Sequence, residues 1–138
     1  MTAELEVREV AAAVIAHKGK VLVQTRPEAG RYQGYWEFPG GGREPGESAQ
    51  ACACREVEEE VGLGITVLRS LDVVDWSYPG VRVRIEFMLC TPQDAEPEVH
   101  AREGQELRWV DGDELGALQF LPASQAVVDS LRVQLTED

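Results

Sequence analysis

Three glutamates, Glu56, Glu59 and Glu60, constrain this chain more than any other feature, because a helix would place their side chains on one face. Neighbouring carboxylates on a helix repel one another. These three also lie toward its C-terminal end, where the helix dipole disfavours negative charge. A divalent cation would neutralise the cluster, and ligation by oxygen alone suits the hard ions Mg²⁺ and Mn²⁺. The alternative interpretation is a solvated acidic face without a ligand.

The segment that carries these glutamates is predicted to be a loop followed by a helix. Residues 39–46 are rich in glycine and proline, which is typical of a loop. Residues 49–61 contain neither, Ser48 is a suitable N-cap, and Gly62 stands where a glycine commonly ends a helix.

The rest of the chain reads as strands followed by helices. The expected strands are residues 10–16 and 21–25, joined as a hairpin, then 36–38, then 67–76 and 81–90 as a second pair, and finally 105–110. Asp111 followed by Glu114 predicts a capping box, and Pro122 suits the first turn of a C-terminal helix. This order predicts an α/β fold in which helices pack on a mixed sheet.

Length, charge and cysteine content exclude several classes of protein. The chain has 138 residues, the usual size of one domain, and its 43% of apolar residues suffice for a core. A net charge of −12 disfavours binding to nucleic-acid polymers and to anionic membranes. No membrane-spanning run or signal peptide is recognisable, and the three cysteines show no Cys-x-x-Cys spacing. We therefore expect a cytoplasmic protein with reduced thiols.

The spacing around the glutamates resembles the signature of the Nudix hydrolase family. Gly41 is followed after five residues by Glu47 and after seven more by residues 55–63, so that every defined position of the signature, 41–63, is matched. The resemblance implies one α/β/α sandwich domain over residues 1–138. It also implies hydrolysis of a nucleoside diphosphate linked to another moiety, with Mg²⁺ or Mn²⁺ as cofactor.

By the same resemblance, catalysis and metal binding belong to the loop and the helix. Glu56, Glu59 and Arg55 form the expected catalytic group, and Glu56 is the candidate that orients or deprotonates water. The expected metal ligands are Glu56, Glu59, Glu60, the Gly40 carbonyl and Glu103.

Three further residues of the signature are expected to be structural. A bidentate pair between Arg55 and Glu47 would tie the loop to the helix. Gly41 allows the backbone to approach closely, and Gly62 ends the helix.

Neighbouring segments resemble the MutT-type branch of the family, which hydrolyses nucleoside triphosphates. Residues 36–41 are similar to the segment before the signature in that branch, and an ungapped alignment from there makes Arg26 a substrate-contacting arginine. Residues 102–105 resemble the loop that carries a further metal-binding glutamate, here Glu103. Tyr78 is a candidate for stacking on a base, and otherwise a turn residue.

Two positions depart from the MutT pattern. Ser124 stands where MutT has an asparagine that recognises oxidised guanine, and a hydroxyl cannot present an amide's donor and acceptor together. Selectivity for 8-oxoguanine is therefore in question, with Ser124 as the substrate-binding residue at that position. Gly42 stands where many relatives have lysine, and Arg43 is a candidate to compensate.

The function predicted from the sequence is hydrolysis of a nucleoside or deoxynucleoside triphosphate to the monophosphate and pyrophosphate. The expected partner is a small nucleotide, with no nucleic-acid polymer and no membrane. Two alternatives remain: a hydrolase of ADP-ribose or another nucleoside diphosphate conjugate, and a catalytically idle domain that binds a nucleotide.

Overall fold

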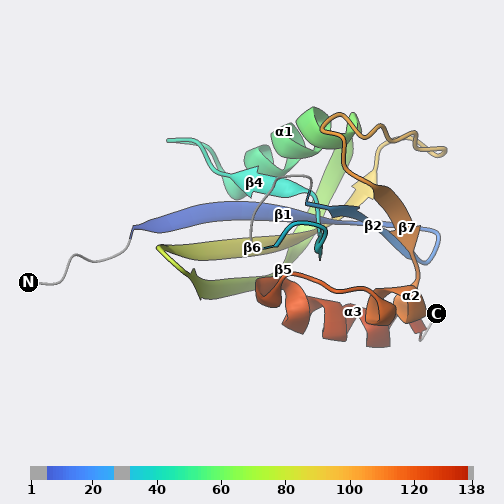
Figure 1. Cartoon of the computed structure of the whole chain (residues 1–138). Coiled ribbons are helices and arrows are strands. Elements are labelled where there is room, and N and C mark those ends of the chain that lie inside the picture. Colours follow the sequence, from blue (N-terminus) through green and yellow to red (C-terminus); the bar gives the residue numbers. More distant parts are fainter. Residues whose placement is uncertain (1–5, 27–31, 137–138) are drawn as a thin grey trace, which may run out of the picture.

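A central mixed sheet is covered by helices on both faces in the computed structural model, which describes residues 6–26 and 32–136. In chain order the elements are β1 (Val7–His17), β2 (Lys20–Thr25), β3 (Trp36–Glu37), β4 (Gly40–Gly42), α1 (Ala49–Val61), β5 (Ile65–Tyr78), β6 (Val81–Pro92), β7 (Leu107–Val110), α2 (Gly112–Ala117), a 3₁₀ turn (Pro122–Ser124) and α3 (Gln125–Thr136). Figure 1 shows α1 on one side of the sheet and α2 with α3 on the other. The α/β class predicted from the sequence is confirmed. None of the helices in the described ranges is long and apolar enough to cross a membrane.

β1 organises the sheet because it pairs with three other strands. It runs parallel to β6 from Val7↔Arg82 to Ile15↔Cys90, and it forms the predicted hairpin with β2. On the side opposite β6, its first half pairs with β4. β5 continues the sheet beyond β6, while β3 and β7 flank β2.

Successive side chains of β1 enter two hydrophobic cores. Ala11, Ala13 and Ile15 pack in the core under α1, with Val57 and Val61 of that helix. The intervening residues Ala12 and Val14 belong to the core under α3, which contains Phe38, Phe87, Val127, Val128 and Leu131. Burial on both faces explains why this strand is apolar throughout instead of alternating.

The helix that carries the glutamates begins and ends as predicted. The Ser48 hydroxyl accepts a hydrogen bond from the Ala51 N–H at 3.1 Å. At the other end, Gly62 adopts a left-handed conformation with φ 68°, and its N–H donates to the Glu58 carbonyl at 3.0 Å. The two caps thus determine where the helix begins and ends, and the segment that carries the glutamates lies between them.

Strand β4 was not predicted from the sequence. The pairs Val10↔Gly42 and Ala12↔Gly40 join it to β1, within the stretch that was predicted to be a loop. A run of glycines carries no side-chain periodicity, so only tertiary pairing reveals the strand. A Cβ at position 40 would collide with the Ala11 carbonyl oxygen. Glycine at this position therefore allows the backbone of β4 to approach β1 closely.

The C-terminal helix also begins later than predicted. Pro122 opens a 3₁₀ turn that ends at Ser124, and α3 starts at Gln125. The capping box of Asp111 and Glu114 is present at the start of α2, as predicted.

Candidate active site

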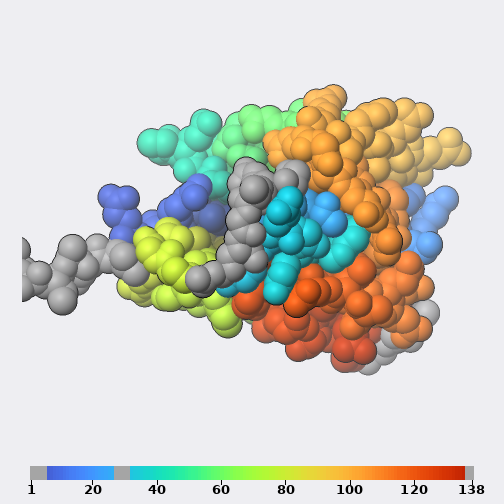
Figure 2. All heavy atoms as spheres, in the orientation of Figure 1, coloured from blue at the N-terminus to red at the C-terminus, as the bar shows by residue number. Residues whose placement is uncertain are grey.

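A pocket of about 710 Å³ lies between the β1–β6 face, β4, α1 and the loop before β7. In Figure 2 the segment after residue 31, in cyan, lies between the loop before β7, in orange, and α3, in red. Most of the site residues predicted from the sequence line the pocket: Arg26, Gly40, Gly41, Glu56, Glu60, Tyr78, Glu103 and Ser124. Glu47, Arg55, Glu59 and Gly62 are not part of its lining.

Glu60 is the most deeply buried carboxylate of the pocket, with 4% of its surface exposed. Gln24 Nε2 donates to its Oε1 at 2.7 Å, and the Gly40 N–H donates to its Oε2 at 3.1 Å. Burial is the main cause that raises the pKa of Glu60 to about 8; the hydrogen bond from Gln24 opposes the shift, and the charge of Glu56 adds to it. Ionised Glu60 is therefore unfavourable in this pocket unless a positive charge is bound beside it.

Without divalent metal, the protein is expected to lose stability as the pH rises. The pKa of Glu60 is about 8 in the folded chain against an ordinary 4.5. Between these values the folded state keeps a proton that the unfolded state has released, so the free energy of unfolding falls as the pH increases. Thermal unfolding followed by circular dichroism in a chelator, across this pH range, measures the slope.

The matched variants for this measurement are Glu60→Gln and Glu58→Gln. The first removes the titrating group and should flatten the decline of Tm with pH. The second changes a side chain that is 58% exposed and should keep the wild-type slope. If Glu60→Gln retains the full decline, a different group releases the proton.

Arg55 ties the loop to α1 and also restrains two of the glutamates. Its Nε and Nη2 donate to the two carboxylate oxygens of Glu47 at 2.8 and 2.9 Å, which is the bidentate pair expected from the sequence. Its Nη1 lies 3.0 Å from Glu56 Oε1 and 3.3 Å from Glu59 Oε2. Hydrogen bonding to Arg55 is the main cause that lowers the pKa of Glu47 to about 2, so the pair stays charged.

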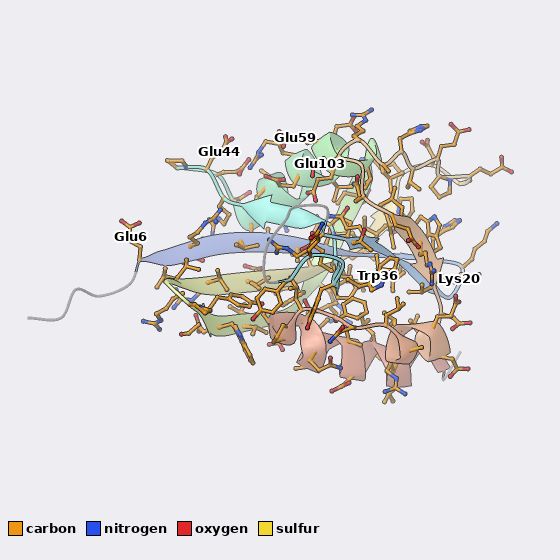
Figure 3. The ribbon with its side chains drawn as sticks, in the orientation of Figure 1. Glu6, Lys20, Trp36, Glu44, Glu59 and Glu103 are labelled. Atoms are coloured by element: carbon orange, nitrogen blue, oxygen red, sulfur yellow. The ribbon has the colours of Figure 1, made fainter. Side chains whose placement is uncertain are left out.

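Glu59 is not part of the pocket lining in this structure. Its side chain is 54% exposed and is paired with Arg55. Figure 3 shows Glu59 on α1 and Glu103 on the loop before β7, both on the α1 side of the sheet. Of the three glutamates grouped from the sequence, Glu56 and Glu60 therefore line the pocket, and Glu59 does not.

The carboxylate oxygens of the pocket are the type of ligand that a hard divalent cation prefers. Glu56 and Glu60 supply carboxylate oxygens, and a Cβ on Gly41 would lie 2.5 Å from Glu56 Cδ, so glycine there leaves room for that carboxylate. Within the described ranges, no three His, Cys, Asp or Glu side chains are grouped so as to hold an ion by themselves. Mg²⁺ is usually held by one or two carboxylates together with water and substrate phosphates, and two carboxylates at the pocket meet that requirement.

Two buried glutamines that the sequence analysis did not single out connect the site to the sheet. Gln24 on β2 donates to Glu60, and Gln105 Nε2 donates to Gln24 Oε1 at 3.2 Å and to the Glu60 carbonyl at 2.9 Å. Gln105 Oε1 accepts from the Glu103 N–H at 2.9 Å, which fixes that loop beside α1. The sequence did contain a signal for Gln24, because this residue interrupts an apolar strand. A buried amide needs hydrogen-bond partners, so a polar group was to be expected beside it.

The predicted substrate-binding residues come from three separate segments. Arg26 Nη1 lies 3.4 Å from Glu37 Oε1, at the end of β2. Tyr78 is the last residue of β5 rather than part of the turn, and its ring packs edge-on against Tyr32 with 5.4 Å between centroids. Ser124 is 5% exposed and its N–H donates to the Leu121 carbonyl at 2.9 Å. All of them line the same pocket.

Comparison with known proteins places the whole arrangement in one family. The model of the NUDIX domain matches residues 6–131. An 8-oxo-dGTP diphosphatase of Haemophilus influenzae is 32% identical over 124 residues, which are 89% of this chain and 90% of that protein. A CTP pyrophosphohydrolase of Escherichia coli is 46% identical over 59 residues, which are 43% of this chain and 44% of that protein.

Solved structures agree with the sequence comparisons. A MutT chain, from Aliivibrio salmonicida or Vibrio cholerae, superposes with a TM-score of 0.72 at 28% identity, covering 91% of this chain and 96% of that one. The resemblance stated from the signature is thereby confirmed. The chain belongs to the NUDIX domain family, and it is a MutT-like hydrolase that acts on phosphoanhydride bonds.

Proposed function

We propose that this protein is a cytoplasmic, divalent-metal-dependent enzyme that hydrolyses a nucleoside triphosphate, or its deoxy form, to the monophosphate and pyrophosphate. The observation that carries the proposal is the pocket in which Glu56 and Glu60 meet the glycine strand Gly40–Gly42. Relatives named 8-oxo-dGTP diphosphatase and CTP pyrophosphohydrolase support a triphosphate substrate.

The carboxylates of the pocket are proposed to bind metal and to handle water. A divalent cation, when bound, supplies positive charge beside the phosphate oxygens. Glu60, Glu59, Glu103 and the Gly40 carbonyl are the proposed ligands. Glu56, whose Oε1 is held 3.0 Å from Arg55 Nη1, is the proposed ligand that also orients or deprotonates the attacking water.

The nucleotide is proposed to lie along the remaining lining of the pocket. Arg26 is positioned at the pocket to contact a phosphate or the sugar, and Tyr78 offers an aromatic ring for the base. Ser124 offers one hydroxyl on the same lining.

A substrate panel tests the proposal. Release of pyrophosphate or phosphate is measured for dGTP, 8-oxo-dGTP, CTP and ADP-ribose with Mg²⁺ and with Mn²⁺. We expect pyrophosphate and a monophosphate from at least one triphosphate, with ADP-ribose a poor substrate. ADP-ribose turned over faster than every triphosphate would favour the conjugate hydrolase instead, and no turnover of any compound would favour the idle domain.

Metal binding predicts a thermal shift. Millimolar Mg²⁺ or Mn²⁺ should raise the Tm of the metal-free protein, because a ligand at a hundred times its Kd stabilises the folded state by about 2.7 kcal/mol. The shift should be largely lost in the Glu56→Gln, Glu60→Gln double variant and kept in Glu58→Gln. Equal shifts in all three proteins would instead indicate general screening of the acidic surface.

A further inference from the structure

Arg8 lies at the pocket in the space that a side chain at position 42 would enter. Arg8, Val10 and Ala12 are alternate residues of β1, and all three line the pocket. β1 pairs with β4 through Val10↔Gly42. A Cβ placed on Gly42 would have a single neighbour within 4 Å, Arg8 Nη2 at 3.1 Å.

Arg8 differs in its partners from Arg43 and Arg26. Arg43 is engaged elsewhere, because its Nε and Nη2 donate to the Glu47 carbonyl at 3.0 and 2.8 Å. Arg26 is paired with Glu37 at 3.4 Å. In residues 6–26 and 32–136, by contrast, the Arg8 side chain has no hydrogen bond or ion pair.

The order of charges along β4 indicates what Arg8 is placed to bind. Gly40 donates its N–H to Glu60, Gly41 lies against the Glu56 carboxylate, and Gly42 lies against Arg8. A polyphosphate that passes the two carboxylates along this strand therefore meets a positive group at the far end. A guanidinium there can donate two parallel hydrogen bonds to one phosphate.

We propose that Arg8 binds the terminal phosphate of the nucleoside triphosphate. It supplies from β1 a positive charge beside Gly42, and it favours triphosphates over substrates without a terminal phosphate. The inference rests on the proposed function, because it needs a triphosphate in the pocket.

The test compares Arg8→Gln with Arg82→Gln. Arg82 lies on β6 opposite Val7, and its substitution removes the same charge. Arg82 is not part of the pocket lining, although its neighbours Val81 and Val83 are. Arg8→Gln should lower kcat/KM for the best triphosphate of the panel about tenfold or more, as expected for one lost charge-assisted contact. It should weaken binding of inorganic tripolyphosphate, measured by calorimetry, by a similar factor, and leave nucleoside monophosphate binding unchanged. Arg82→Gln should match wild type throughout.

A charge swap provides the second arm. The backbone at Gly42 does not adopt a positive φ, and its one close neighbour is Arg8, so lysine is sterically acceptable once Arg8 is shortened. Gly42→Lys in the Arg8→Gln background should restore tripolyphosphate affinity.

Two results would overturn the inference: an Arg8→Gln protein that matches Arg82→Gln, or one that loses monophosphate and tripolyphosphate affinity equally. Failure of the proposed function is distinct, since it appears as wild-type protein that turns over no triphosphate. The calorimetric comparison with tripolyphosphate still decides about Arg8 in that case.

Discussion

Glu56→Gln and Glu60→Gln are each expected to lower kcat by about a hundredfold or more, the effect typical of removing a group that positions water or a metal ion. Both side chains line the pocket, and both lie against β4. Turnover of the best triphosphate is measured at saturating Mg²⁺ and Mn²⁺, with Glu58→Gln as the control that changes an exposed carboxylate of the same helix. Near wild-type turnover in either variant would show that the metal site is assigned wrongly.

The same variants should leave the fold intact or make it more stable. Burial, with the charge of Glu56 adding to it, raises the pKa of Glu60 to about 8, so ionised Glu60 is unfavourable in the metal-free fold. Glu56→Gln removes the neighbouring charge, and Glu60→Gln removes the group that would ionise. The gain should be clearer for Glu56→Gln. At position 60 both carboxylate oxygens accept hydrogen bonds, from Gln24 and Gly40, and an amide can accept at only one of them. Chemical denaturation of the metal-free proteins measures the difference in the free energy of unfolding.

Local signals were sufficient to predict most of the fold. The limits of α1 follow from Ser48 and Gly62, because a cap is set by chemistry within a few residues. The uniform apolar character of residues 10–16 follows from burial on both faces of the sheet. The strand β4 could not be predicted in this way, since its partner is β1 and its glycines carry no pattern.

In the candidate site, too, the contacts within the signature could be predicted from the sequence, whereas contacts with distant segments could not. Spacing on one helix grouped the glutamates, and the Arg55–Glu47 pair joins two segments of one motif. Gln105, in the loop before β7, and Arg8, on β1, are distant in the sequence from the helix α1. Only the three-dimensional structure shows that both lie at the site. The spacing of the glutamates also could not show that Glu59 lies outside the lining, where its side chain is paired with Arg55.

The wild-type preference for 8-oxo-dGTP over dGTP is expected to be modest, or replaced by preference for another base. Ser124 lines the pocket and is 5% exposed, at the position where the MutT resemblance has an amide. One lost polar contact that distinguishes two substrates corresponds to about 1–3 kcal/mol, or roughly tenfold to a hundredfold in selectivity. A kcat/KM ratio in the many thousands for 8-oxo-dGTP over dGTP would contradict this expectation.

Ser124→Asn should raise that ratio, since an amide presents a donor and an acceptor together to the edge of the oxidised base. Ser130→Asn is the matched control: it makes the same substitution on α3, at an exposed residue whose Oγ accepts from Gln134 Nε2 at 3.2 Å. The control should leave the ratio unchanged, whereas Ser124→Asn should increase it by a factor comparable to one hydrogen bond. A Ser124→Asn protein with the wild-type base preference across the whole nucleotide panel would mean that the base is recognised elsewhere in the pocket. Tyr78 would then be the first residue to substitute, because its ring lines the same pocket and packs against Tyr32.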